Sequence, residues 1–468
     1  MNSVTRSVKN GTSLHNRSAK YPLARRLDFR ITRLEKWARR IAMSFVRSLL
    51  VVAACLLLHA PTAIAQSTIA QEYDCDTEPW LCRSPQLTGD WFGLRTSAAE
   101  QGYTFLADNT SFFFGNTRGG VNQDFVFGGH GDYLMYLDGG KLGLQEGLSL
   151  KLRAEQRFGE TIVNDVGCFI SPTLLADLPV FNSNQLYLTN VLLTQQLSET
   201  VGVFAGKMDT LDGDLNAFAH GRGKTQFSNM GFVFNPIVGA TVPYSTLGAG
   251  FFVLRDGLPM FMFAILNSQD TSNTSGFREL FNDGLLLSTS LRVPTSFFGL
   301  PGHHLFGGTW NSKTYYSIGE AYIQYPDVII PTTRGSWCLY WNGDQYLVVD
   351  PQDPARGWGT FYRAGIADPN TSPLSWYLSF GVGGSSPFGS RPADTFGVGW
   401  YYAGTSSQIG PLIVAQFGPI SNGQAVELYY NWQLTPAIRV TPDLQVIVPA
   451  LTDNKPALLV GLRTQLIF

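Results

Sequence analysis

The chain has 468 residues, of which 44% are hydrophobic, 15% charged and 13% aromatic, and 49 are glycine. This composition is lower in charge and richer in glycine and aromatic residues than that of most soluble domains, and it favours β structure with little solvated surface. The formal net charge is −2, but residues 1–65 hold 12 of the 33 bases and 2 of the 35 acids, so residues 66–468 carry −12. Such an acidic chain repels phosphates, which argues against nucleic-acid binding.

A ten-residue apolar run, Leu49–Leu58, precedes the small-x-small sequence Ala63-Ile64-Ala65. The run covers only about half of the ~20 apolar residues that a membrane-spanning helix needs. We therefore interpret residues 43–65 as a secretory signal peptide that is cleaved after Ala65. A lipoprotein cleaved before Cys55 is the alternative, although four further apolar residues would then follow the lipidated cysteine.

Residues 1–42 are long, basic and polar, which is unusual before a signal peptide. Met43 opens a compact signal sequence, so we expect translation to start there and residues 1–42 to be untranslated or an atypical extension. No later stretch approaches 18 consecutive apolar residues. Export without a membrane helix leaves two fates, a soluble exported protein or an outer-membrane β-barrel.

Residues 66–100 form a segment of different character, which we expect to fold in the periplasmic mouth. Asp90 is placed to cap a short helix over Leu94–Gln101. Four cysteines remain after signal cleavage, and in an oxidising compartment they allow three pairings. The short spacing favours a disulfide between Cys75 and Cys82, and four free thiols are the alternative.

Residues 101–468 break into short alternating segments separated by Gly, Pro, Asn and Asp. In Glu427–Leu434, apolar and polar residues alternate with a period of two, which indicates a strand with one apolar and one polar face. Ile438–Val448 and Leu458–Phe468 follow the same rule. Pro442 lies on an apolar face and cannot donate a ladder hydrogen bond, so we expect a bulge or a rim position there.

Alternation alone fits a soluble β-sandwich as well as a membrane barrel. Aromatic clusters such as Phe112–Phe114 and Trp400–Tyr402 favour the barrel, because its two interfaces carry aromatic girdles. The short turn at Thr435 to Ala437 and the longer link from Pro449 to Pro456 match short periplasmic turns and long outer loops. At about 25 residues per strand and connection, the chain predicts an all-β, transmembrane antiparallel barrel of sixteen strands, wide enough for an aqueous channel.

Two stretches, Leu87–Tyr103 and Gly206–Phe234, resemble the OprB family of carbohydrate-selective porins. The family pattern usually has Gly where this chain has Phe92. The resemblance implies a monomeric outer-membrane barrel of a Gram-negative bacterium that passes sugars by facilitated diffusion. Resemblance to outer-membrane barrels in general implies that the assembly machinery reads Phe468 as an aromatic C-terminal signal. The residues of the N-terminal family motif are Gly89, Asp90, Trp91, Gly93 and Arg95.

A sugar pathway needs side chains that replace part of the solute's hydration. The alternation in Leu148–Gly159 points Arg153, Glu155 and Arg157 into the lumen, where they act as a group on the solute or form a purely structural network. By resemblance, Lys207 and Asp209 line a constriction. The residues expected to line the substrate pathway are Lys151, Arg153, Glu155, Arg157, Lys207, Asp209, Glu427, Tyr429, Asn431, Arg439, Asp443 and Arg463.

Enzymatic and metal-binding patterns are weak. The acidic cluster after Lys207 lacks EF-hand spacing, and His303 and His304 would point to opposite sides of a strand. No nucleophile elbow occurs, and Gly221-Arg222-Gly223-Lys224 lacks the spacing of a P-loop. The sequence therefore predicts a porin for carbohydrates such as glucose that needs no cofactor or metal and is not an enzyme. The alternatives are a general or differently selective porin for small polar or aromatic solutes and a sugar-binding surface β protein that does not transport.

Overall fold

The computed structural model describes residues 83–351, 353, 356–388 and 391–468. The predicted signal peptide, the extension 1–42 and the Cys75–Cys82 disulfide lie outside the described residues. Within them, Cys168 and Cys338 are free thiols.

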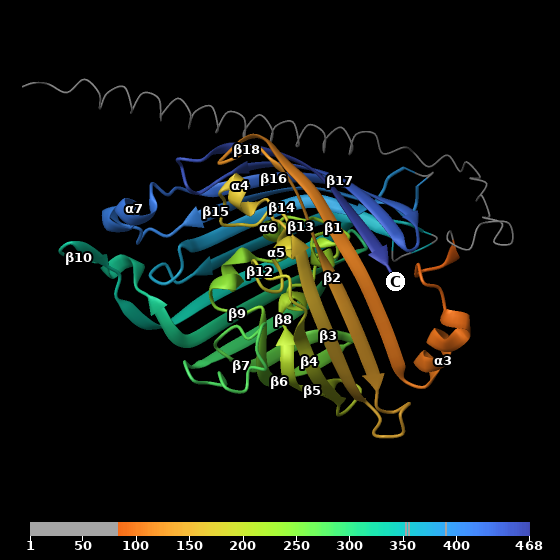
Figure 1. The fold of residues 1–468 in the computed structure, drawn as a ribbon. Helices are drawn as coiled ribbons and strands as arrows, with labels where there is room; N and C mark the ends of the chain where they lie inside the picture. Colours follow the sequence, from red (N-terminus) through yellow and green to blue (C-terminus); the bar gives the residue numbers. More distant parts are fainter. Residues whose placement is uncertain (1–82, 352, 354–355, 389–390) are drawn as a thin grey trace, which may run out of the picture. The chain divides into compact units, whose positions relative to one another are not determined.

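In the described part of the chain, sixteen antiparallel strands form one closed barrel (Figure 1). The strands are β1 (Tyr103–Gly120), β2 (Phe125–Asp138), β3 (Leu148–Gly159), β4 (Tyr187–Gln196), β5 (Val201–Asp209), β6 (Ser245–Arg255), β7 (Leu258–Asn267), β8 (Leu285–Phe297), β9 (Leu300–Tyr316), β12 (Thr332–Val349), β13 (Gly357–Ala367), β14 (Leu374–Ser385), β15 (Thr395–Thr405), β16 (Gly423–Thr435), β17 (Ile438–Val448) and β18 (Lys455–Ile467). Strands β10 (Tyr322–Gln324) and β11 (Asp327–Ile329) form a separate hairpin between β9 and β12.

The barrel closes between its first and last strands. β1 pairs with β18 from Asp108↔Ile467 to Gly120↔Lys455, and every other barrel strand pairs with its neighbours in the order of the chain. Closure removes the unpaired strand edges that an open sheet would expose. The predicted sixteen-stranded barrel is therefore confirmed and the sandwich is excluded.

Burial along the last three strands follows the predicted alternation. Glu427 and Tyr429 point inward and are fully buried, whereas Leu428 and Trp432 point outward and are 45% and 44% exposed. The bulge expected at Pro442 is absent, because the pairing of β17 keeps the same register before and after this residue on both sides. The shift in this region lies instead between Gln433 and Thr435 of β16, next to the turn.

The two ends of the barrel differ in the length of their connections. One end carries turns of two residues at 256–257, 298–299 and 436–437, and β1 begins and β18 ends there. The other end carries the long connections 160–186, 210–244, 268–284, 317–331 and 406–422. In barrels of this kind the short turns face the periplasm and the long loops face outward.

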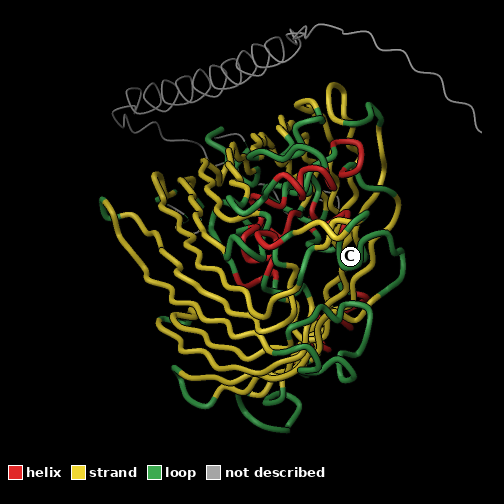
Figure 2. The backbone as a smooth tube through the Cα atoms, turned by 90° about the vertical axis from the view of Figure 1, so that its left-hand side faces the viewer, coloured by secondary structure: helices red, strands yellow, loops and turns green. Residues whose placement is uncertain are grey.

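Two of the long connections, 160–186 and 210–244, fold into the barrel, and we call them the inward connections. Figure 2 shows their helical turns inside the ring of strands. The inward connections contain α4 (Val163–Val166), α5 (Leu174–Asp177), η2 (Leu211–Gly213), η3 (Gly221–Gly223), α6 (Met230–Val233) and η4 (Pro236–Ala240). η5 (Ile318–Glu320) and α7 (Pro411–Phe417) lie in other connections of the same end. None of the helices in the described ranges is long and apolar enough to span a bilayer.

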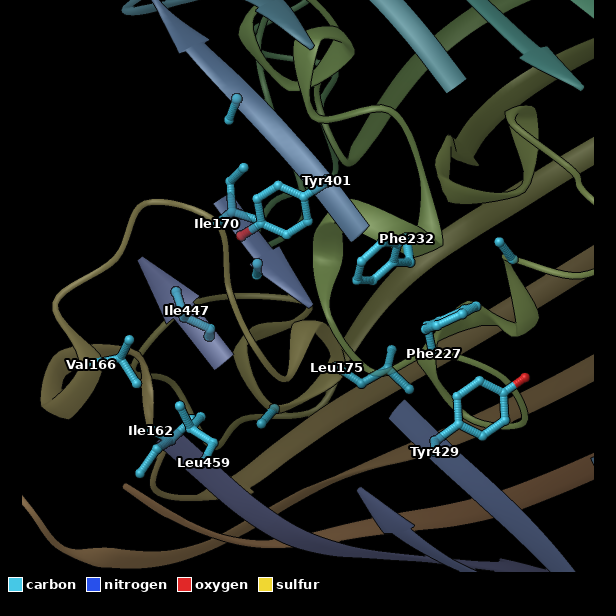
Figure 3. Packing of buried hydrophobic residues seen from close by; sticks show 14 of the residues in the cluster. Ile162, Val166, Ile170, Leu175, Phe227, Phe232, Tyr401, Tyr429, Ile447 and Leu459 are labelled. Atoms are coloured by element: carbon cyan, nitrogen blue, oxygen red, sulfur yellow. The ribbon is translucent and has the colours of Figure 1, made fainter. Parts of the chain in front are cut away.

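The inward connections pack on one side of the inner wall and make a hydrophobic core inside the barrel (Figure 3). Phe227 contacts Tyr429 of β16 with ring centroids 4.9 Å apart, and Phe232 contacts Tyr401 of β15 at 5.5 Å. All four side chains are buried. This core holds the connections in place and narrows the lumen.

A short helical segment precedes β1. It consists of η1 (Trp91–Gly93) and α3 (Leu94–Glu100), so the helix predicted in this region is confirmed. The Asp90 carboxylate accepts hydrogen bonds from the backbone N–H and the hydroxyl of Thr96, both at 2.9 Å. Asp90 thus satisfies a donor in the first turn of α3, although Gly93 occupies the N-cap position.

Candidate functional site

A glycine-flanked turn carries Arg222 into the lumen. Gly221, Arg222 and Gly223 have φ values of 52°, 50° and 75° in the short helix η3. Glycine adopts positive φ without steric cost, and the two glycines let the chain reverse tightly around one bulky residue. The turn lies within the inward connection 210–244 and presents the guanidinium to β3, η2 and β5.

The Arg222 guanidinium contacts four acceptors. Its Nη1 lies 2.6 Å from Oδ1 of Asp212, and its Nη2 lies 2.8 Å from Asp209, 3.3 Å from Glu155 and 3.2 Å from the Tyr244 hydroxyl. The Tyr244 hydroxyl in turn donates to the Glu155 carboxylate at 2.7 Å. These contacts tie β3, β5 and the inward connection together around one cation.

Arg153 of β3 is the second centre of the cluster. Its Nε donates to Asp132 of β2 at 3.1 Å, and its Nη1 pairs with Asp209 and lies 3.4 Å from Asp212. Lys224 extends the cluster to β1, with Nζ 2.6 Å from Asp108 and 2.7 Å from Asp132. We call the following set the lumen charge network: Asp108, Asp132, Lys151, Arg153, Glu155, Asp209, Asp212, Arg222, Lys224 and Tyr244.

Only part of the lumen charge network is accessible. The side chains of Asp212, Lys151, Asp108 and Arg222 are 36%, 21%, 15% and 11% exposed. Those of Arg153, Glu155 and Asp209 are 5% exposed or less. These four side chains are the accessible part of the network, and the buried members hold them in place.

Electrostatics keep Asp212 and Arg222 charged. Burial raises the pKa of Asp212, but the attraction of Arg222, a hydrogen bond from His220 and the attraction of Arg153 outweigh it, so the pKa lies well below its usual value. Burial also lowers the pKa of Arg222, and the surrounding carboxylates, led by Asp209, raise it well above its usual value. Both groups are ionised at neutral pH.

The β3 residues that were predicted to act as a group have different partners in the structure. Arg153, Glu155 and Lys151 join the lumen charge network. Arg157 does not, because its guanidinium donates to the carbonyl oxygens of Ala176 and Gly159 and to Asn184. Arg157 therefore fixes the inward connection 160–186.

Lys207 and Asp209, the two residues predicted to line a constriction, also have different partners. Asp209 lies in the lumen charge network through its contacts with Arg153 and Arg222. Lys207 donates instead to the carbonyl oxygen of Thr274 at 2.7 Å, in the connection between β7 and β8. Proximity in sequence did not distinguish them, because successive inward residues on a strand reach different heights in the barrel.

Five predicted lumen residues of β16–β18 lie under residues 223–229 of the inward connection. Glu427 accepts the backbone N–H groups of Ser228 and Asn229 at 2.6 and 3.0 Å, and Asp443 accepts the Ser228 hydroxyl at 3.1 Å. Asn431 and Arg463 donate to carbonyl oxygens of the same stretch, and Tyr429 packs on Phe227. All five are 3% exposed or less. Arg439 is only partly buried and donates to Gln465 at 2.9 Å.

Other participants were missed from the sequence. Arg222 and Lys224 sit in a stretch without periodicity, and Asp132 occupies an inward position of β2 that the alternation could have revealed. Arg363 of β13 is fully buried and donates to Asp214 at 2.9 Å and to the carbonyl oxygen of Phe232 at 2.8 Å. The inward connection is therefore held by charged wall residues on two sides of the barrel.

The two adjacent histidines point to opposite sides of β9, as expected. His303 is buried with its Nδ1 2.7 Å from Asp344, and His304 stacks on Trp341 with ring centroids 5.7 Å apart. The described residues contain no group of three or more His, Cys, Asp or Glu side chains arranged to hold a metal ion.

The N-terminal family motif lies where β18 pairs with β1 and closes the barrel. The Arg95 guanidinium covers the Trp91 ring at 4.3 Å and donates to the carbonyl oxygens of Phe105 and Phe468 at 3.2 and 3.4 Å. The Leu87 N–H donates to the Ile467 carbonyl at 2.8 Å. The motif thus joins the first and last strands at the short-turn rim.

Comparison with known proteins agrees with this architecture. Porin B of Pseudomonas aeruginosa is 24% identical over 468 residues, covering 88% of this chain and 97% of that protein. The putative porin QuiX of Acinetobacter baylyi is 22% identical over 438 residues, covering 84% and 93%. The high-pH structure of Pseudomonas putida OprB matches with a TM-score of 0.72 at 22% identity, over 84% of this chain and 100% of that one.

The family profile described as "Carbohydrate-selective porin, OprB family" matches residues 129–468, which is more than half of the chain. With the sixteen-stranded barrel closed around a charged lumen, this match shows that the chain is an outer-membrane β-barrel and belongs to the OprB family of carbohydrate-selective porins.

Proposed function

We propose that the protein mediates passive, facilitated diffusion of monosaccharides such as glucose across the outer membrane, without a cofactor and without chemical change of the solute. The observation that carries this proposal is the accessible part of the lumen charge network, where Lys151, Asp212 and Arg222 stay partly exposed. A hexose exposes hydroxyl groups around its ring, and charged donors and acceptors replace part of their hydration. Because both signs of charge stand side by side, a neutral polyol is favoured over an ion of either sign.

The buried members of the network act by positioning. Arg153 and Glu155 hold Asp212 and Arg222 at fixed places, so that a passing sugar meets preformed hydrogen-bonding groups. A preformed site loses little side-chain entropy on binding, and a moderate affinity lets the solute leave again. Residues 223–229, held by β16–β18, keep the turn that carries Arg222 in position.

The test is conductance of the purified porin in planar bilayers with glucose added. We expect glucose to reduce the ion current in a saturable way, and K151A and D212N to weaken this block. R255A is the matched control, since Arg255 lies 65% exposed beside the turn 256–257. A current that glucose does not change would reject sugar selectivity, and equal effects of K151A, D212N and R255A would remove the network from the pathway.

Two alternatives have distinct outcomes in the same apparatus. A general porin, or a porin for small aromatic or other polar solutes, would conduct without glucose block and would be blocked by those solutes. A sugar-binding surface protein would bind glucose and give no current. We expect the pore to act as a monomer, which single-channel traces with one uniform conductance step would support.

A further inference from the structure

Phe92 has a conformation that nothing inside the described protein accounts for. Its backbone lies in the left-handed region with φ 59° and ψ 35°, directly after Trp91 with φ 49°. Left-handed backbone is disfavoured for bulky L-residues, which is why the family pattern with glycine here is the expected one. The Phe92 side chain is nevertheless fully exposed, with a relative exposure of 109%. A strained residue that exposes a large apolar ring indicates a role outside the protein.

Phe92 is part of a small apolar surface. Trp91 of η1 is 40% exposed, and Leu94, the first residue of α3, is 65% exposed. The Trp91 ring lies 6.2 Å from that of Phe105, which occupies an outward position of β1 and is 36% exposed. The contacts of Arg95 with Phe105 and Phe468 fix this segment to the rim. The surface therefore continues the lipid-facing side of the barrel at its short-turn end.

We propose that Trp91, Phe92 and Leu94 form an interfacial anchor that inserts into the periplasmic leaflet of the outer membrane. The occupant of this surface is phospholipid, because the surface is continuous with the lipid-facing belt through Phe105. Aromatic residues favour the boundary between headgroups and acyl chains, and an apolar helix start can lie in that boundary without crossing the membrane. Arg95 stacks on Trp91 at 4.3 Å and so places a positive charge beside the proposed anchor.

The proposed anchor also stabilises the pairing of β18 with β1. The segment is attached to both β1 and β18 through Arg95 and Leu87. Lipid contact at Phe92 therefore holds the motif against the place where the barrel closes.

The test is fluorescence quenching by lipids that carry bromine on their acyl chains. F92W adds one indole at the proposed anchor, and E100W adds one at the exposed far end of α3. Both variants are reconstituted in phosphatidylethanolamine–phosphatidylglycerol vesicles with and without brominated acyl chains, and the wild-type signal is subtracted. We expect the added emission of F92W to be quenched at least twofold more than that of E100W. Equal quenching at the two sites would overturn the proposal.

A second measurement, of proteolysis, does not depend on fluorescence. Trypsin cleavage after Arg95 is followed in the same vesicles for the wild type, F92S and F92W. We expect faster cleavage of F92S and wild-type resistance of F92W, and we expect the difference between wild type and F92S to shrink in detergent micelles without a bilayer. Unchanged resistance of F92S in vesicles would contradict an anchor at this position. Gel mobility before and after heating confirms that each variant forms a barrel.

Discussion

At the residue scale, Arg222 carries the accessible end of the lumen charge network, and R222A is expected to weaken glucose block. Hydrogen bonds to charged groups are worth about 1.5–3 kcal/mol, so we expect the dissociation constant to rise about tenfold or more. R222K keeps the charge but presents a point charge in place of a planar fork, so it should recover only part of the block. Titration of glucose against single-channel current measures both. Wild-type block in R222A would show that Arg222 serves the architecture alone.

The pKa of Asp212 leads to a prediction, also at the residue scale, about how glucose block depends on pH. Burial raises the pKa of Asp212, but Arg222, a hydrogen bond from His220 and the positive charge of Arg153 hold it well below the usual value. A depressed pKa means that the pairing of Asp212 is complete above its ordinary pKa and is lost only as the pH falls through the lower, folded-state value. Glucose block should therefore stay constant from about pH 8 to about pH 5 and decline in stronger acid. If block declined between pH 7 and 5 in the wild type but not in D212N, this assignment of Asp212 would be wrong.

At the scale of elements, the wall strands β16–β18 fix residues 223–229 of the inward connection. Glu427 accepts two backbone N–H groups there, one on each carboxyl oxygen, and E427Q keeps the shape but replaces one accepting oxygen with an NH2 group. We expect the amides of Ser228 and Asn229 to exchange with deuterium about tenfold faster or more, since a buried donor that loses its acceptor costs about 1–3 kcal/mol. Current noise of the open pore should rise, because the turn with Arg222 is then less firmly held.

The control for that experiment is R439A. Arg439 bonds only to another wall residue, Gln465, among the contacts that the described structure gives it. Its loss should leave the exchange of Ser228 and Asn229 unchanged. Equal acceleration in E427Q and R439A would mean that the barrel wall loosens as a whole and that Glu427 has no particular hold on the inward connection.

The elements also show what a sequence can and cannot predict here. The alternation of Glu427–Leu434 predicted its strand and its two faces, because lipid outside and polar surroundings inside impose a period of two. The inward connection 210–244 was not predicted, because it has no period and its partners, such as Glu427 and Arg363, lie more than 100 residues away. Glu427 was therefore predicted to line the pathway on the evidence of its inward face, and only the structure places residues 223–229 over it. Whether any of these residues contacts solute stays a prediction.

At the scale of the whole molecule, stability depends on closing β18 against β1. The backbone N–H of Phe468 donates to the Ala107 carbonyl at 2.8 Å, and its carbonyl accepts from Arg95, so F468A keeps these bonds and removes only the ring. We propose that the ring is recognised during assembly by the outer-membrane insertion machinery. F468A should then lower the amount of heat-modifiable barrel in the outer membrane several-fold and leave the conductance of assembled pores unchanged. L466A, two residues earlier on the same face of β18, removes apolar contact without touching the ring. An equal loss in both variants would assign the effect to lipid contact of the closing strand, and normal assembly of F468A would exclude the signal.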